Sequence, residues 1–322
     1  MGSPRRVAII SGLSWLFSYP LFTQPNLDIR PRPPALFQPR APVNLRVESS
    51  LVLVPVTVCD QKNRPVTGLE RDHFKVFDDK IEQTVTHFAM DDAPVAVGLV
   101  FDTSGSMGAK LKRSRMAATA FFREANPEDE FFLVTFSDRP KLVAPLTNDV
   151  DDIQNRLSFL ESRGSTALLD ALMLAMHEMK KSKKPRKALL IISDGGDNSS
   201  RYSEAELRGI VRESDVMIYA LGIFESSASR SRSPEELAGP GLLSDIAEQT
   251  GGRHFPVDNV SEMPDIAAKV SIELRNRYLL GYSPTDRHRD GRYHHVQVKV
   301  FPPHGLPNLH AFWRLGYYAP LE

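Results

Sequence analysis

Several features that would indicate common classes of protein are missing from this 322-residue chain. Its single cysteine, Cys59, excludes an internal disulfide framework. Lys plus Arg and Asp plus Glu each number 40, so the net charge is zero and nothing favours general nucleic-acid binding. Beyond the amino-terminal segment, no apolar run is long enough for a membrane-spanning helix. The 41% hydrophobic and 25% charged residues are typical of a globular protein with one large core or two domains.

The amino-terminal segment, residues 1–23, indicates export. A pair of arginines precedes a mostly apolar run, Val7 to Phe22, which is short and is interrupted by Ser and Pro. This pattern is typical of a secretory signal peptide, and an uncleaved anchor is the alternative. Residues 24–43 are rich in Pro and Arg and are expected to form an extended linker. We therefore expect a periplasmic, cell-envelope or extracellular protein whose membrane contact is limited to the amino-terminal segment.

The stretch that says most about function is VAVGLVFDTSGSM, residues 95–107. Val95 to Phe101 form an unbroken apolar run, which predicts a buried parallel strand, and a helix-competent segment follows the polar turn. In α/β proteins, ligands bind at the carboxyl ends of such strands. Asp102, Ser104 and Ser106 alternate, so an extended turn can direct three oxygens at one point. One carboxylate and two hydroxyls suit Mg²⁺, Mn²⁺ or Ca²⁺ better than thiophilic metals.

This turn resembles the metal-ion-dependent adhesion site of the von Willebrand factor type A family, D-x-S-x-S followed further along by a Thr and an Asp. Thr166 in GSTALLDAL matches the second part and Asp194 in LLIISDG matches the third. Taken singly, each residue would be an ordinary helix cap or turn residue. Together they favour the functional interpretation. The resemblance implies that one divalent cation, Mg²⁺ or alternatively Mn²⁺ or Ca²⁺, is held by Asp102, Ser104, Ser106, Thr166 and Asp194.

The alternation of strand-like and helix-like segments over residues 93–276 predicts a doubly wound, mostly parallel sheet. The resemblance implies the same Rossmann-like α/β domain, with six strands. Residues 44–92 and 277–320 contain further strand-like segments separated by turns. We expect these two flanking segments to pair in one β-sandwich, because the first is too small to bury a core alone; two separate β extensions are the alternative. His294 and His295 are neighbours on one such strand and face opposite sides, so solvated side chains are expected.

Two loops are expected to share the face of the metal site, because they also follow strand ends. These loops span residues 195–202 and 225–234. Arginines in them would attract an acidic partner, and mobile Ser/Arg-rich loops without a binding role are the alternative. Asp197 is expected to be a turn residue rather than a metal ligand. The predicted partner-binding rim consists of Asp197, Arg201, Arg230 and Arg232.

The resemblance implies a divalent-metal-dependent protein-binding module for adhesion or assembly, and not an enzyme. An open coordination position would accept a Glu or Asp carboxylate from a protein partner. A non-catalytic scaffold for envelope assembly, with an unused or internally liganded site, is the alternative. A metal-dependent hydrolase is less supported, because no His flanks the three motif segments to act as a base. No Gly-rich loop ending in Gly-Lys-Ser/Thr is present, so no nucleotide is expected.

Overall fold

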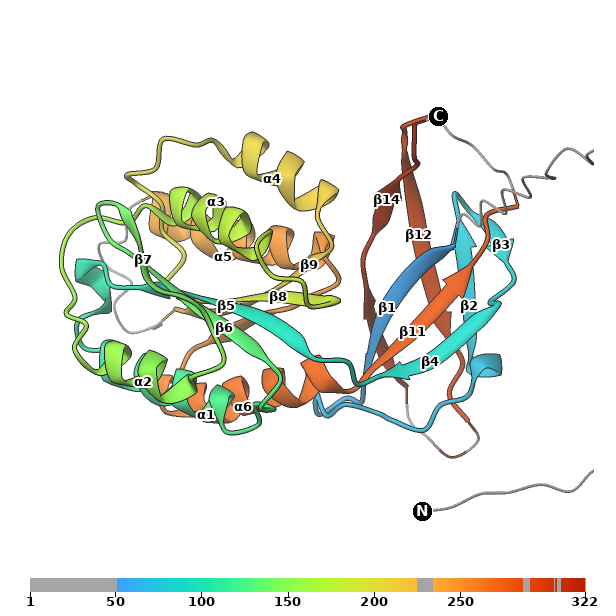
Figure 1. Cartoon of the computed structure of the whole chain (residues 1–322), viewed down its shortest axis with the longest axis horizontal. Coiled ribbons are helices and arrows are strands. Elements are labelled where there is room, and N and C mark those ends of the chain that lie inside the picture. Colours follow the sequence, from blue (N-terminus) through green and yellow to red (C-terminus); the bar gives the residue numbers. More distant parts are fainter. Residues whose placement is uncertain (1–50, 225–233, 286–289, 304, 306–307, 322) are drawn as a thin grey trace, which may run out of the picture. The chain divides into compact units, whose positions relative to one another are not determined.

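A computed structural model describes residues 51–224, 234–285, 290–303, 305 and 308–321 (Figure 1). The predicted signal segment and linker, together with Arg230 and Arg232, lie outside the described residues. No helix within the described ranges is long and apolar enough to cross a membrane.

A six-stranded sheet with the order β10-β9-β8-β5-β6-β7 forms the middle of the described chain. Its strands are β5 (Val95–Asp102), β6 (Glu130–Phe136), β7 (Pro140–Thr147), β8 (Arg186–Ser193), β9 (Val216–Ile223) and β10 (His254–Val257). Neighbouring strands are parallel except for β6 and β7, which are antiparallel. Every residue of β5 and β9 is buried, as expected of strands covered on both faces.

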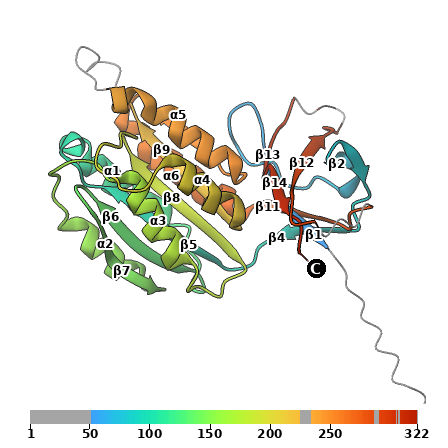
Figure 2. The same cartoon turned by 90° about the horizontal axis from the view of Figure 1, so that it is seen from above.

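Helices cover both faces of this sheet (Figures 1 and 2). They are α1 (Leu111–Phe122), α2 (Val150–Ser158), α3 (Leu168–Met179), α4 (Glu204–Glu213), α5 (Pro234–Gln249) and α6 (Met263–Arg275). Helices α1, α2 and α6 pack on one face, and α3, α4 and α5 pack on the other. Alternate residues of β5 serve the two cores, with Leu99 in one and Val100 in the other. This arrangement confirms the predicted doubly wound α/β fold.

The flanking segments form two four-stranded antiparallel sheets, with the orders β13-β1-β11-β4 and β14-β12-β2-β3. Their strands are β1 (Val52–Cys59), β2 (Phe74–Asp78), β3 (Ile81–Gln83), β4 (His87–Asp91), β11 (Arg277–Tyr282), β12 (Tyr293–Val300), β13 (His310–Trp313) and β14 (Gly316–Tyr318). Each sheet combines strands from before and after the α/β domain, and residues of both sheets share one apolar core. The predicted sandwich of flanking strands is therefore confirmed as part of the fold class.

The last strand-like segment differs from its pattern-based prediction. The sequence favours one strand over residues 311–318, but the structure has two, β13 and β14, in different sheets. β13 pairs with β1, and β14 pairs with β12. The chain therefore crosses between the layers of the sandwich within this segment. Short 3-10 helices elsewhere occupy Arg71–His73, Gly105–Met107 and Val260–Glu262.

Candidate metal site

Asp102 is the last residue of β5 and is fully buried. Its Oδ1 accepts a hydrogen bond from the backbone N of Ser104 at 2.8 Å, and its Oδ2 accepts one from Ser193 Oγ at 2.6 Å. Burial, followed by the negative charge of Asp194, raises the pKa of Asp102 to about 6, although the hydrogen bonds act in the opposite direction. A carboxylate in this environment is stabilised by a nearby positive charge.

Asp194 lies directly after β8, the strand that pairs with β5. Asp194 is 8% exposed, and its Oδ2 is 3.2 Å from the ammonium nitrogen of Lys110. Lys110 immediately precedes α1 and its side chain is 15% exposed. Lys110 could not be predicted from the sequence, because one lysine at a helix start carries no distinctive pattern. The structure thus places a cation at the carboxylate pair.

Ser104 and Ser106 lie at the short helix that follows β5. Their hydroxyl oxygens are 3.0 Å apart, although Ser104 is buried and Ser106 is exposed. Neighbouring oxygen ligands of an octahedral Mg²⁺, each about 2.1 Å from the ion, would be separated by about 3.0 Å. The spacing of the two hydroxyls therefore suits the edge of such a coordination shell.

Thr166 is brought to this turn by backbone hydrogen bonds from the segment that precedes it. Gly105 N donates to Gly164 O at 3.0 Å, and Arg163 N donates to Thr103 O at 2.8 Å. Thr166 is 6% exposed, and its backbone N donates to Asn198 Oδ1 at 2.9 Å in the loop after β8. The segment carrying Thr166 is therefore joined to both of the other segments that carry predicted ligands.

The donor set fits a hard divalent cation. It contains two carboxylates, one at the end of each of two paired parallel strands, and three hydroxyls from the adjoining turns. Burial and the charge of Asp194 disfavour the ionised form of Asp102, and a divalent cation would stabilise that form. An oxygen set of this type matches Mg²⁺, Mn²⁺ or Ca²⁺.

Two of the predicted rim residues lie within the described chain. The carboxylate of Asp197 accepts hydrogen bonds from the backbone N atoms of Leu169, Ser199 and Ser200 at 3.0–3.3 Å, so it shapes the loop and the start of α3. The Arg201 side chain is 82% exposed, with its Nε 3.7 Å from Asp170 Oδ2. Of the two, only Arg201 thus offers an exposed charge to a partner.

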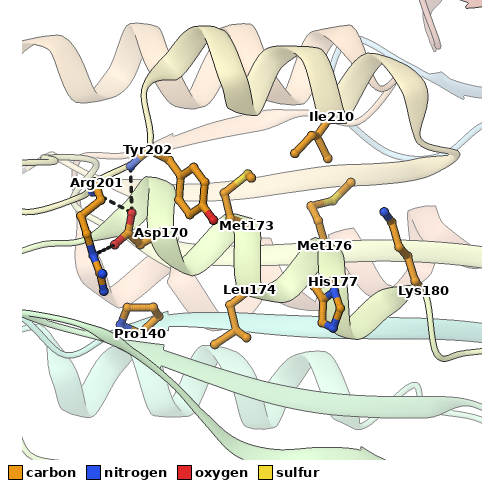
Figure 3. A pocket seen from close by; sticks show the side chains of 10 residues that line it. All are labelled: Pro140, Asp170, Met173, Leu174, Met176, His177, Lys180, Arg201, Tyr202 and Ile210. Carbon is orange, nitrogen blue, oxygen red and sulfur yellow. Dashed lines mark hydrogen bonds and ion pairs between the residues drawn. The ribbon is translucent and has the colours of Figure 1, made fainter.

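An open hollow of about 690 Å³ lies beside Arg201, between α3 and α4 (Figure 3). Asp170 is at one end of it, where its Oδ1 accepts hydrogen bonds from the backbone N atoms of Arg201 and Tyr202. Met173 and Ile210 contribute apolar surface from the two helices. This hollow could not be predicted from the sequence, because its lining is assembled from elements far apart in the chain.

Comparison with known proteins shows what part of the α/β domain is similar to. Residues 97–196 match the von Willebrand factor type A domain family. This match covers about a third of the chain. A solved structure of a von Willebrand factor type A protein from Catenulispora acidiphila resembles this chain with a TM-score of 0.50 at 13% identity, covering 85% of this chain and 75% of that one. At this identity the likeness concerns the fold.

Two curated relatives match parts of this chain. An uncharacterized protein of Borreliella burgdorferi is 22% identical over 210 residues, which cover 56% of this chain and 61% of that protein. Inter-alpha-trypsin inhibitor heavy chain H4 of Bos taurus is 26% identical over 145 residues, which cover 40% of this chain and 16% of that protein. The matched region thus spans less than two thirds of the length of either relative.

Proposed function

We propose that this chain is a divalent-metal-dependent protein-binding module of an exported protein, used in adhesion or assembly. The observation that supports it most is the presence of two carboxylates, Asp102 and Asp194, at the ends of paired parallel strands beside two hydroxyls 3.0 Å apart. Asp102, Ser104, Ser106, Thr166 and Asp194 would hold the ion. Mg²⁺ is the proposed ion, with Mn²⁺ and Ca²⁺ as alternatives.

The chain's own charges explain how such a site would recognise a protein. Two carboxylates balance a divalent charge, while the neutral hydroxyls leave the bound cation able to attract a Glu or Asp carboxylate of a partner. Arg201, which is exposed in the loop after β8, would attract the same acidic partner before contact. The groups that contact the two aspartates include the hydroxyl of Ser193 and the ion-paired ammonium of Lys110. Neither is placed as a free base beside an attacking water, so we propose binding and not hydrolysis.

Metal binding is tested by calorimetric titration of the whole chain with Mg²⁺ and with Mn²⁺. Asp102→Asn removes one of the two carboxylates. Loss of a residue that only supports a metal ligand typically lowers metal affinity by about tenfold or more, so loss of a ligand is expected to weaken binding at least that much. Asp151→Asn, which removes an exposed carboxylate in the first turn of α2, serves as the matched control and should bind normally. Equal affinities for both variants and the unchanged chain would exclude this site.

Partner binding is tested separately by recovery of proteins from cell-envelope extract, with and without chelator. For the proposed module, we expect the unchanged chain to recover a partner protein only without chelator, and we expect Asp102→Asn not to recover it. Recovery that is equal in all arms would instead favour the second candidate, a scaffold whose metal site is unused or is filled by a carboxylate of its own chain.

A further inference from the structure

A second group of metal-ligating side chains lies in the sandwich, in residues remote in sequence from the type A motif. Asp78 ends β2, Asp79 follows it in the turn to β3, and His294 lies on β12. The backbone ties the turn to β12, because Asp79 N donates to His295 O and His295 N donates to Asp79 Oδ1, both at 2.9 Å. Residues that precede and follow the α/β domain in sequence are thus brought together.

The ligating atoms of these three residues are close enough to share one ion. They all lie within 4.8 Å of one another. His294 Nδ1 is 2.9 Å from Asp79 Oδ2 and 3.9 Å from Asp78 Oδ1. Ligands of a tetrahedral Zn²⁺, each about 2.0–2.1 Å from the metal, would be about 3.3 Å apart, between these two distances. Small side-chain adjustments would therefore complete the geometry.

One oxygen of the buried Asp78 carboxylate makes no hydrogen bond to the described residues. Asp78 is 6% exposed, and its Oδ1 has no hydrogen-bond partner among the described residues. Its other oxygen, Oδ2, accepts hydrogen bonds from the hydroxyls of Tyr282 at 2.9 Å and Tyr317 at 2.8 Å. A buried carboxylate oxygen without a partner is unfavourable, and a metal ion in the cluster would satisfy it. Hydrogen bonds of the kind donated by the two tyrosines orient ligating carboxylates in metal sites.

The surroundings of His294 agree with a metal ligand. Its Nε2 is 3.4 Å from Asp290 Oδ1, so that Asp290 can hold one ring N–H while Nδ1 faces Asp78 and Asp79. The ring stacks on Tyr317, with centroids 5.6 Å apart. Its side chain is 12% exposed, which contradicts the sequence-based expectation of a solvated strand histidine. The strand alternation was correct, but the ring of Tyr317, on the neighbouring strand β14, stacks on His294 and shields it from solvent.

We infer that Asp78, Asp79 and His294 form a site for a divalent transition metal of the Zn²⁺ class, separate from the type A motif. One imidazole and two carboxylates favour Zn²⁺ over Mg²⁺, which prefers oxygen ligands alone. Three protein ligands leave a fourth position for water or a ligand. The bound ion would fasten the β2–β3 turn to β12 and so join the amino-terminal and carboxy-terminal strands of the sandwich.

The second site is tested on the whole chain carrying Asp102→Asn, so that the candidate metal site at the end of β5 contributes least to metal binding. After removal of metal by chelator, Co²⁺ is added and its visible absorption spectrum recorded, and Zn²⁺ is then titrated to displace it. One equivalent of Co²⁺ with a tetrahedral spectrum is expected. His294→Gln should lose that spectrum and weaken Zn²⁺ binding tenfold or more. His295→Gln, on the opposite side of the same strand, is the matched control and should bind normally.

Asp79→Asn provides a second variant that preserves the turn. Asp79 has φ +44° and Lys80 has φ +73°, and Asn is well suited to such turn positions while it lacks the carboxylate. It should weaken Zn²⁺ binding as His294→Gln does, with an unchanged circular dichroism spectrum. Unaltered Zn²⁺ binding in both variants, or no stoichiometric binding by the parent chain, would show that the cluster only joins β2 to β12 through contacts among its own side chains.

Discussion

At the scale of single residues, a buried polar cluster joins elements of the α/β domain to elements of the sandwich. The guanidinium of Arg253 donates to Glu273 of α6 at 2.8 Å and to Cys59 of β1 at 3.5 Å. Its other terminal nitrogen donates to Asn63 Oδ1 at 2.6 Å. Both Cys59 and Glu273 are at most 1% exposed. The single cysteine is therefore a buried member of this structural cluster.

The thiol of Cys59 should be nearly unreactive in the folded protein. Burial and the charge of Glu273 raise its pKa from 9.0 to about 12, so at pH 8 its thiolate fraction would be about a thousandfold smaller than in the unfolded chain. Any contribution to stability is lost as the pH rises from 9 through 12, because only the unfolded thiol ionises readily in that range. The measurement is alkylation by iodoacetamide at pH 8, native against urea-unfolded. Equal rates in the two states would contradict the prediction.

At the scale of elements, α5 packs against the loop that carries Asp194. Gly239 of α5 contacts the backbone of Gly195, and a Cβ at Gly239 would overlap that backbone. Gly195 itself has φ +83° and turns the chain directly after Asp194. The close approach of two glycines therefore fixes the position of one predicted metal ligand.

Gly239→Ala should displace this loop, lower the free energy of unfolding by about 1–3 kcal/mol and weaken Mg²⁺ binding. Gly241→Ala is a matched control in the same helix, because its added Cβ would meet nothing within 4 Å. The control should be neutral or slightly stabilising, since Ala favours helix more than Gly. Urea denaturation and calorimetric Mg²⁺ titration measure the two effects. Similar results for both variants would mean that the glycine contact does not position Asp194.

At the scale of the whole molecule, the sandwich requires both ends of the described chain. β1 lies between β13 and β11, and β12 lies between β14 and β2. Helix α6 ends at Arg275 and β11 begins at Arg277, so the α/β domain continues into the sandwich with one residue between them. Arg253 adds side-chain contacts with the sandwich, with its guanidinium carbon 4.3 Å from the ring centroid of Phe312 in β13.

Arg253→Met should destabilise the whole described unit, because it leaves the buried carboxylate of Glu273 without its partner. The loss is expected to be about 3–5 kcal/mol in the free energy of unfolding. Lys75→Met is the control, because its ion pair with Glu82 is about half exposed on both sides and contributes at most about 1 kcal/mol. Calorimetric unfolding measures both, and Cys59 alkylation should be faster in Arg253→Met. A loss no larger than that of the control would contradict the prediction.

Much of the fold could be predicted from local sequence patterns. The apolar run from Val95 to Phe101 is the buried strand β5, and the flanking segments form the sandwich expected of them. The segments carrying Asp102, Thr166 and Asp194 adjoin one another, although their role as metal ligands stays a prediction. Local sequence patterns could not show that residues 311–318 divide between two sheets. That division depends on tertiary pairing, because the first half pairs with β1 and the second half pairs with β12.

The sequence by itself determined the order and type of most elements and the motif at the end of β5, since periodicity and turn chemistry act over a few neighbouring residues. Only the tertiary structure decided that Lys110 pairs with Asp194, that Arg253 joins α6 to β1, and that His294 meets Asp78. These contacts join residues up to 216 positions apart in the chain, and their distances follow from how strands pair and layers pack. No local pattern carries that information, because the same residues would be ordinary surface charges if the layers met differently.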